Sequence, residues 1–208
     1  MKQADDRVPY PSTVDELTAL ARAAGRGDRA ALAAFVRQTQ GDVWRFCAHL
    51  VDPAAADDLT QETYLRAIPA LGRFRGDAPV RSWLLTIARR ACAAEIDARS
   101  KNRALSARLA AESVTGLSSV PEPAGQAALG LLLGALDADR RAAFVLTQMI
   151  GCSYAEAAAI CGCRVGTIRS RVARARADLD EMLAEPPAAA PLRAVSGGAG
   201  LAAVNTED

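Results

Sequence analysis

The segment from residue 153 to residue 184 constrains the fold more than any other part of the chain. Ser153 can cap a helix and Glu156, three residues later, can complete a capping box, so a short helix is expected to begin near Tyr154. Gly162 can adopt the left-handed conformation that ends a helix, and a second helix follows four residues later. The sequence therefore predicts a helix-turn-helix.

The second helix of this motif has its charges sorted along its length. Between Arg164 and Arg176 there are five arginines and no acidic residue, whereas acidic residues follow directly. At 3.6 residues per turn the helix has an apolar stripe for burial, made of Val165, Ile168, Val172, Ala175, Leu179 and Leu183. The opposite face is small, donor-rich and positive: Gly166, Ser170, Ala173 and Arg174, flanked by Arg169 and Arg176 on one side and by Thr167 and Arg171 on the other.

Such a face suits the phosphates of DNA and the acceptor edges of guanine in a major groove. A solvated arginine face is the plainer alternative for an isolated helix. The glycine turn and the short capped helix in front of it favour DNA binding.

The remaining sequence is also predicted to be helical. Half of the residues are hydrophobic, only 4% are aromatic, and alanine and leucine are frequent, which together favour an all-α fold. Four helices are expected in the first half. The first begins with a capping box of Thr13 and Glu16 and ends near Gly25, and the second runs from the cap Asp28 to Val51. The third begins at the cap Asp52, has Pro53 in its first position and ends at Pro69 or Gly72, and the fourth runs from Arg81 to about Arg99. Four more are expected near residues 126–136, 139–150, 154–161 and 166–184.

Composition divides the chain into two small helical domains joined by a flexible linker. The predicted parts are a flexible N-terminus (1–12), a first domain (13–99), a linker rich in Ser, Gly and Pro (100–125), a second domain with the helix-turn-helix (126–185) and a disordered tail (186–208). Fully extended, the linker could span about 80 Å at ~3.3 Å per residue. The two domains therefore need not touch.

Helical spacing also predicts which side chains lie in the core of the first domain. Leu59, Thr63, Ile68 and Tyr64 are expected to face inward from the third helix. Trp83 shares a stripe with Leu84 and Ile87 and is expected to be a core residue as well, because a buried tryptophan is the commoner case.

The net charge of +1 conceals a block distribution of charge. Residues 52–62 include four acidic residues and no basic one, whereas residues 73–108 include nine basic residues and only three acidic ones. No membrane-spanning run and no signal segment is found, which predicts a cytoplasmic protein. No catalytic triad, phosphate-binding glycine loop or paired-carboxylate motif argues for an enzyme.

The five cysteines are odd in number, and a cytoplasmic chain keeps its thiols reduced. Cys161 and Cys163, with Cys152 and the only histidine, His49, could form a zinc site or a thiol redox sensor. Small buried cysteines beside a turn glycine are the simpler interpretation, so no metal and no cofactor are expected. His49 is most simply structural.

Three ordered segments resemble the hallmark motifs of the bacterial extracytoplasmic-function (ECF, group IV) sigma factors, especially those of actinobacteria. They are DDLTQETYLRA at 57–67, FRGDAPVRSWLLTIAR at 74–89 and SYAEAAAICGCRVGTIRSRVARAR at 153–176. The resemblance covers about residues 13 to 184. It implies that residues 13–99 are a sigma region 2 domain, which binds core RNA polymerase and the promoter −10 element. Residues 126–185 would be a region 4 domain that binds the −35 element.

The resemblance also implies roles for single residues. Those expected to dock on the clamp coiled coil of the polymerase's largest subunit are Asp57, Asp58, Leu59, Gln61, Glu62 and Arg66. Those expected at the −10 element, where a loop captures a flipped base, are Arg73, Phe74, Arg75, Gly76, Asp77, Arg81 and Arg90. Those expected at the −35 element are Arg164, Thr167, Arg169, Ser170, Arg171, Ala173, Arg174 and Arg176. Arg90 and Ala94 depart from the asparagine and the acid that the family often has there.

The sequence thus predicts a detachable specificity subunit that directs transcription initiation and strand opening by a polymerase which performs the chemistry. The resemblance adds an anti-sigma factor as a possible partner. Two alternatives stay open: a helix-turn-helix regulator that binds operator DNA without polymerase, and a zinc or thiol sensor.

Overall fold

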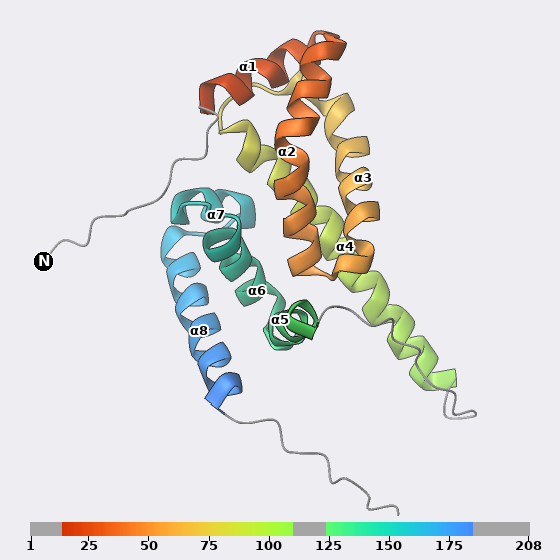
Figure 1. The fold of residues 1–208 in the computed structure, drawn as a ribbon, viewed down its shortest axis with the longest axis vertical. Coiled ribbons are helices and arrows are strands. Elements are labelled where there is room, and N and C mark those ends of the chain that lie inside the picture. Colours follow the sequence, from red (N-terminus) through yellow and green to blue (C-terminus); the bar gives the residue numbers. More distant parts are fainter. Residues whose placement is uncertain (1–13, 110–123, 185–208) are drawn as a thin grey trace, which may run out of the picture.

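The structure is a computed structural model that describes residues 14–109 and 124–184. All regular elements in these two ranges are helical, which confirms the all-α fold class. Figure 1 shows that the first range forms a bundle of α-helices and that the second forms a smaller group beside it. The predicted N-terminal segment, the middle of the predicted linker and the predicted tail lie outside the described residues.

The bundle consists of α1 (Val14–Gly25), α2 (Arg29–Leu50), α3 (Pro53–Ala70), a short 3-10 turn η1 (Leu71–Arg73) and α4 (Val80–Leu109). Two predicted caps are confirmed: Asp28 accepts hydrogen bonds from the amides of Ala30 and Ala31, and Asp52 accepts one from the amide of Ala55. Pro53 occupies the start of α3, where its missing N–H leaves no hydrogen bond unmade. The predicted cap Thr13 lies outside the described residues.

The fourth helix is longer than predicted. It was expected to end near Arg99, but α4 continues to Leu109. Its last turns contain good helix formers and neither glycine nor proline. An ion pair of Glu95 and Arg99 at (i, i+4), with 2.6 Å between Oε1 and Nε, supports the helix where it was expected to stop.

The smaller group consists of α5 (Ala124–Ala135), α6 (Ala138–Phe144), a π-helical turn η3 (Val145–Met149), α7 (Tyr154–Cys161) and α8 (Val165–Ala184). The predicted capping box is present: Ser153 Oγ accepts from the Glu156 amide, and Glu156 Oε2 accepts from the Ser153 amide. Gly162 ends α7 with φ of 65°, which a residue with a side chain rarely adopts. The helix-turn-helix prediction is confirmed.

Most of the predicted core residues are buried, and the exceptions are informative. On α8, Ile168, Val172 and Ala175 are buried, whereas Val165 and Leu183 are 37% and 68% exposed because they stand in the first and the last turn. On α3 the buried stripe runs through Leu59, Thr63, Tyr64 and Ala67. The prediction for Ile68 was wrong: it lies one position around the helix from Ala67 and is 40% exposed.

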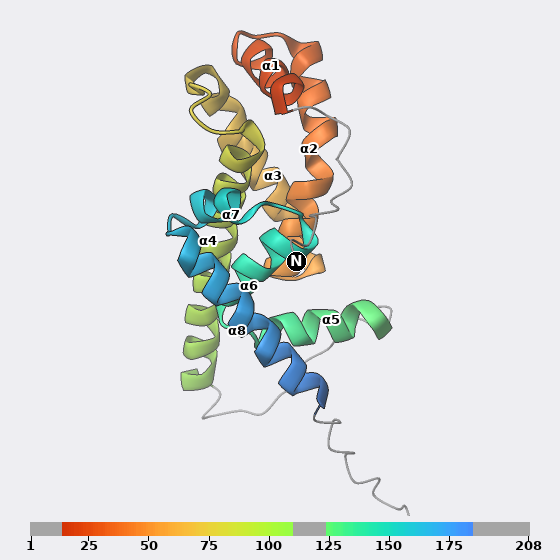
Figure 2. The same cartoon turned by 90° about the vertical axis from the view of Figure 1, so that its left-hand side faces the viewer.

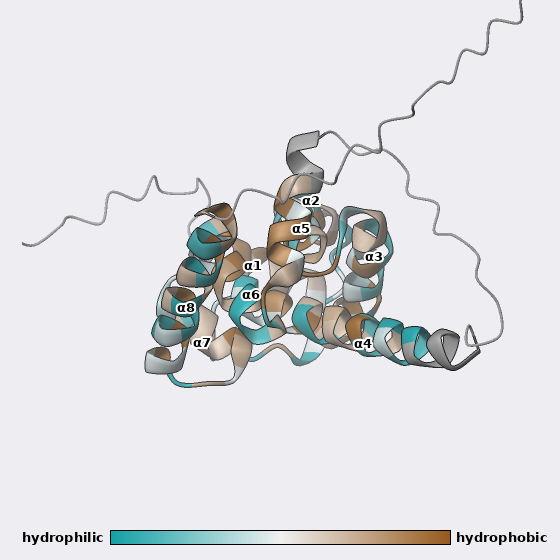
Figure 3. Cartoon of the chain, turned by 90° about the horizontal axis from the view of Figure 1, so that it is seen from below, coloured by the Kyte–Doolittle hydropathy of each residue, from teal (hydrophilic) through white to brown (hydrophobic). Residues whose placement is uncertain are grey.

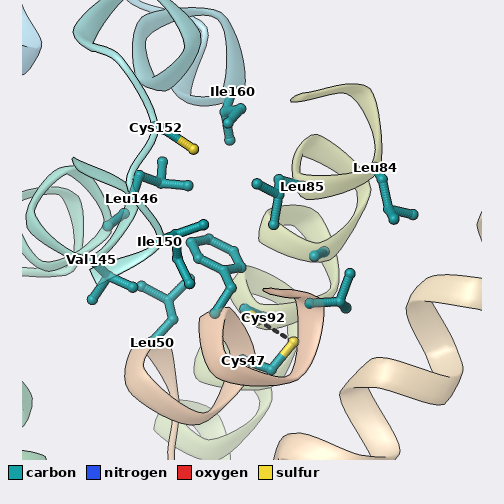
Figure 4. Close-up of a cluster of buried hydrophobic side chains, with 14 of the residues drawn as sticks. Cys47, Leu50, Leu84, Leu85, Cys92, Val145, Leu146, Ile150, Cys152 and Ile160 are labelled. Atoms are coloured by element: carbon teal, nitrogen blue, oxygen red, sulfur yellow. Dashed lines mark hydrogen bonds between the residues drawn. The ribbon is translucent and has the colours of Figure 1, made fainter. Parts of the chain in front are cut away.

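The two groups of helices pack directly against each other. In Figures 1 and 2, α6 and α7 lie alongside the bundle, with α7 against α4 and with α6 and η3 against α2. We call this contact the seam and define its apolar part by Leu50 and Leu85 on the bundle side and by Leu146, Ile150, Cys152 and Ile160 on the other (Figure 4). A long linker permits separation, but the structure has the two groups in contact.

Hydropathy follows this arrangement. Figure 3 shows α5 as a largely hydrophobic helix, and the far part of α4 as hydrophilic. Leu133 of α5 belongs to the common core, whereas Leu131 on the same helix is 76% exposed. The core thus continues from the bundle through the seam into the second group of helices.

A buried pair of hydroxyl groups links α2 to α3. The hydroxyl oxygens of Thr39 and Tyr64 lie 2.6 Å apart, and the Thr39 hydroxyl also lies 2.8 Å from the carbonyl of Phe35. A threonine hydroxyl has one proton, so if Thr39 donates it to that carbonyl, Tyr64 is the donor to Thr39. Burial raises the pKa of Tyr64 to about 12, although the bond to Thr39 opposes the shift.

We expect the stability of the protein to fall as pH rises from about 10 to 12, because the unfolded phenol ionises near 10 while the folded one stays protonated. Tyr64→Phe removes this titration. Near neutral pH the variant should be less stable by about 1 kcal/mol, through the lost hydrogen bond. Urea denaturation at several pH values from 8 to 11.5 should show the gap between the two proteins narrowing. A constant gap would contradict the assignment.

Candidate nucleic-acid and polymerase interfaces

The predicted docking residues form an exposed polar surface along α3. Asp57, Asp58 and Gln61 are exposed, and Glu62 and Arg66 form an (i, i+4) ion pair with 2.7 Å between oxygen and nitrogen. Leu59 is the exception, since it is only 7% exposed. It therefore anchors α3 to the core beneath this surface and does not lie on it.

Trp44 of α2 extends the acidic surface and was not predicted from the sequence. Its indole Nε1 donates to Asp57 Oδ1 over 2.8 Å, and 38% of the side chain is exposed. A cleft of about 540 Å³ lies beside it, between Gln40 and Gly41 of α2 and Thr60 of α3. The signal in the sequence was weak, because only contact with Asp57, thirteen residues away, distinguishes Trp44 from a core tryptophan.

The loop between η1 and α4 carries most of the predicted −10 residues. Arg73, Arg75 and Asp77 are exposed, whereas Phe74 is half-buried against Trp83. The two rings lie 5.3 Å apart at 48°, a tilted aromatic contact. Trp83 is half-buried and packs against the core, as predicted, with Phe74 covering it.

A cleft of about 400 Å³ opens between this loop and α1. Its walls are Thr18, Ala19 and Arg22 of α1 and residues 76–79 of the loop. Gly76 and Asp77 were predicted as site residues, but Arg22 was not. Nothing in the sequence indicates that α1 approaches a loop more than fifty residues away.

Arg81 and Arg90 both belong to α4 but lie in different environments. Arg90 is exposed, as a DNA-binding residue would be. Arg81 is half-buried in the seam: its Nε donates to Asp42 Oδ2 over 2.7 Å, and its Nη2 donates to the Ile150 carbonyl over 2.7 Å. Burial lowers the pKa of Arg81, but the Asp42 carboxylate opposes this and the net direction is upward, so the guanidinium stays charged.

The face of α8 that was predicted to point outward is exposed. Arg169, Ser170, Ala173 and Arg174 are all exposed, as is Arg164 in front of the helix. Ser170 Oγ donates to the Thr167 carbonyl over 2.9 Å, which fixes the hydroxyl close to the helix surface. The face is therefore open to a major groove while the opposite stripe holds the helix in the fold.

Two of the arginines predicted at the −35 element have partners within the protein. Arg171 is paired with Asp139 of α6, and the same carboxylate lies 3.4 Å from Nη2 of Arg89 on α4. Arg176 Nη2 donates to Gln148 Oε1 over 2.6 Å. Asp139 thus connects a −35 candidate to the bundle across the seam.

Arg141 of α6 makes one polar bond across the seam and two within its own group of helices. Its guanidinium donates to the carbonyls of Leu50 (3.0 Å), Gly134 (2.7 Å) and Leu136 (3.1 Å). These carbonyls lie at the C-terminal ends of α2 and α5, where a cation is favoured by the helix dipoles. Burial lowers the pKa of Arg141, and Asp137 opposes the shift.

The cysteines do not come together as ligands. Within residues 14–109 and 124–184 no group of three or more His, Cys, Asp or Glu side chains could hold a metal ion. Cys152 is buried in the seam, where burial raises its pKa to about 12. Cys47 and Cys92 are a buried pair in the bundle, with 3.6 Å between sulfurs (Figure 4). His49 is half-buried, and burial together with Arg45 lowers its pKa.

No helix in the described ranges is both long enough and apolar enough to cross a membrane.

Two family models match separate parts of the chain, one in each group of helices. Residues 35–102 match the family model "Sigma-70 region 2", and residues 126–179 match "Sigma-70, region 4". The fold and its exposed helix-turn-helix are therefore those of a sigma-70-type protein.

Individual relatives narrow the class. The chain is 46% identical to the probable RNA polymerase sigma-C factor of Mycobacterium bovis, over 82% of this chain and 91% of the relative. It is 40% identical to the ECF RNA polymerase sigma factor EcfG of Rhodopseudomonas palustris, over 62% of this chain and 71% of that protein. The chain belongs to the ECF family of RNA polymerase sigma factors, of the actinobacterial type.

Two solved structures are similar over both groups of helices. CnrH, in complex with the cytosolic domain of CnrY, is 28% identical with a TM-score of 0.62, over 80% of this chain and 96% of that one. The sigma factor RpoE of Bartonella quintana, in complex with the anti-sigma factor NepR, is 30% identical with a TM-score of 0.60, over 74% and 96%. The protein thus directs promoter-specific transcription initiation by RNA polymerase, as a member of a family of initiation factors that are not themselves enzymes.

We expect Arg141→Met to lower the free energy of unfolding by about 2 kcal/mol, because charged hydrogen bonds to three carbonyls are lost. Urea denaturation measures this change, and hydrogen exchange of the last turn of α2 should accelerate. Arg140→Met, on the same helix, is the matched control. It breaks a single, partly exposed pair with Asp178 and should cost less, about 1 kcal/mol. Equal effects of the two substitutions would show that Arg141 does not stabilise the seam.

Proposed function

We propose that residues 126–185 read the −35 element through the outward face of α8. The observation that carries this assignment is the division of α8 into two faces: Arg169, Ser170, Ala173 and Arg174 are exposed, and Ile168, Val172 and Ala175 are buried. Arg174 and Arg169 would contact acceptor edges of bases, whereas Arg164, Arg171 and Arg176 would contact phosphates. Thr167 stands at the rim of the same face.

Residues 13–99 bind the −10 element and the polymerase. Arg73, Arg75 and Arg90 are exposed on the DNA side of this domain and can hold the backbone of a melted strand. The cleft beside Gly76 and Asp77 has a volume within the range of about 300–1,000 Å³ that is typical of small-ligand sites. It supports the capture of a flipped base by the loop. Arg81 can reach DNA only when its bond to the Ile150 carbonyl is released.

The acidic surface of α3 docks on the polymerase. Asp57, Asp58, Gln61, Glu62 and Arg66 are the contact residues, and Leu59 supports them from the core. Trp44 belongs to the same surface through its hydrogen bond to Asp57. Acidic side chains beside an exposed indole suit a partner surface that is basic and partly apolar.

An anti-sigma factor is a further partner. CnrH and the Bartonella RpoE were each solved in a complex, the first with CnrY and the second with the anti-sigma factor NepR. Both are similar to this chain over at least 74% of its length, which supports a partner of this kind for this chain. The protein works without catalysis of its own, in the cytoplasm with the polymerase.

Asp58→Ala should reduce promoter-specific transcription by core polymerase about tenfold, because a charged contact at the centre of a docking surface is lost. Run-off transcription measures the activity, and titration of labelled protein with core polymerase measures the affinity. Asp180→Ala removes an exposed acid from α8 and serves as the control for charge. Normal core affinity of the Asp58 variant would overturn the docking assignment.

Arg174→Ala should reduce transcription from the best −35 sequence about tenfold and relax the preference at one −35 position. Arg164→Ala should instead weaken all −35 sequences alike and lower the dependence on salt. A library of promoters varied at the −35 element, transcribed by the holoenzyme, separates the two. If the Arg174 variant retains the full preference, α8 does not read bases through this residue. Tight duplex binding without any effect on polymerase would point to the polymerase-independent regulator.

A further inference from the structure

The cleft beside the −10 loop has one wall that does not come from the loop. Thr18, Ala19 and Arg22 line it from the last turns of α1, opposite Gly76 and Asp77. None of these three α1 residues belongs to the motif on which the −10 assignment depends. Their position therefore raises the question of what holds α1 there and what its arginine does.

A close backbone contact fixes α1 next to the loop. A Cβ atom at Gly25, the last residue of α1, would lie 2.6 Å from the carbonyl oxygen of Leu71 in η1. No side chain fits there unless backbone moves, so glycine allows the end of α1 to meet the turn that starts the loop. The α1 wall of the cleft is set by this contact.

A second glycine brings the loop against the Arg22 side chain. Gly76 has φ of 83°, and a Cβ atom on it would lie 2.4 Å from Arg22 Nη2. The guanidinium therefore lies directly on the loop backbone, in space that any side chain at residue 76 would occupy.

The guanidinium N–H groups of Arg22 can donate to a group bound in the cleft. Among the described residues no hydrogen bond or ion pair holds its guanidinium, and the side chain is exposed at the cleft. An arginine presents five N–H donors in a planar fork and no acceptor. Asp77, on the loop side of the same cleft, presents only acceptors when ionised. The cleft thus has a donor wall and an acceptor wall.

We propose that Arg22 is a specificity-determining residue that reads the base held in this cleft and separates the amino bases, cytosine and adenine, from the keto bases, guanine and thymine. A flipped base is read through its Watson–Crick edge. In both amino bases an amino donor, suited to Asp77, stands next to a ring-nitrogen acceptor, suited to Arg22. In guanine and thymine the order is reversed, because a carbonyl oxygen, suited to Arg22, stands next to a ring N–H donor, suited to Asp77. Fixed donor and acceptor walls therefore accept one class of base in a given orientation. The inference rests on the proposed binding of a flipped −10 base by the loop.

The test is transcription by the holoenzyme of core polymerase and full-length protein, from promoters in which each −10 position carries each of the four bases. For Arg22→Met we expect transcription from the best promoter to fall about tenfold, with the preference between amino and keto bases lost at one position. Arg22→Lys keeps the charge but not the planar fork and should restore the activity only in part. Arg26→Met, one residue beyond the end of the same helix and exposed, should leave the profile unchanged.

Each outcome decides the proposal. A loss for Arg22→Met that is equal at all bases would show a phosphate contact and overturn base reading, as would an unchanged profile. A wild-type protein with no base preference at any −10 position would instead overturn the assignment of the loop itself. In the Gly76→Ala background, Arg22→Met should have a smaller effect than in the wild type, because the added methyl group already displaces the guanidinium.

Discussion

The packing of Leu85 on α4 against Ile150 and Ile160 determines how the two DNA-binding groups of helices are presented. This contact is surrounded by polar bonds that need the same approach of the two groups: Arg81 reaches the Ile150 carbonyl, Arg141 reaches the Leu50 carbonyl, and Asp139 pairs with Arg89. Returning one buried leucine or isoleucine to water costs about 1.5–3 kcal/mol. Separating the two groups therefore costs several such contributions together with the polar bonds.

The candidate residues for the two promoter elements differ in their contacts with the seam. The outward face of α8 is exposed while the seam is closed, whereas Arg81, the candidate nearest the −10 loop on α4, is engaged within it. A partner shifts such an arrangement only if it binds one arrangement better than the other. If the proposed contact of Arg81 with a melted strand forms, it must replace the bond to the Ile150 carbonyl, whereas the exposed face of α8 needs no such exchange. The proposed −35 contacts are thus compatible with the closed seam, and the proposed −10 contact of Arg81 requires release of its bond across the seam.

Local sequence patterns predicted the helices and their caps. The features that the sequence did not predict, the seam and the cleft, arise from contacts between residues far apart in the chain. The capping box of Ser153 and Glu156, the Asp52 cap and the Gly162 turn each involve at most four residues, so sequence alone was sufficient. The seam joins residue 81 to residue 150, and the cleft joins residue 22 to residue 76, and no local pattern encodes either contact. The end of α4 was predicted too early because residues 100–109 were assigned to the linker together with the Ser-, Gly- and Pro-rich residues after them, although they are good helix formers. On α3 the exposed Ile68 was misassigned because a single step around the helix separates it from Ala67.

The aromatic residues at and beneath the −10 loop pack within the fold, which leaves DNA contacts at that loop to charge and hydrogen bonding. Phe74 and Trp83 pack on each other at 5.3 Å, and Tyr64 is buried with its hydroxyl paired to Thr39. Stacking on aromatic side chains is tolerant of sequence, because every base has a π-face, whereas hydrogen bonding to a base edge is not. A protein that holds a melted strand with Arg73, Arg75 and a donor–acceptor cleft gains little from a mismatched base. Its capacity to open DNA therefore depends on the match between promoter and protein, and on ionic strength, more than that of a protein with a free aromatic surface.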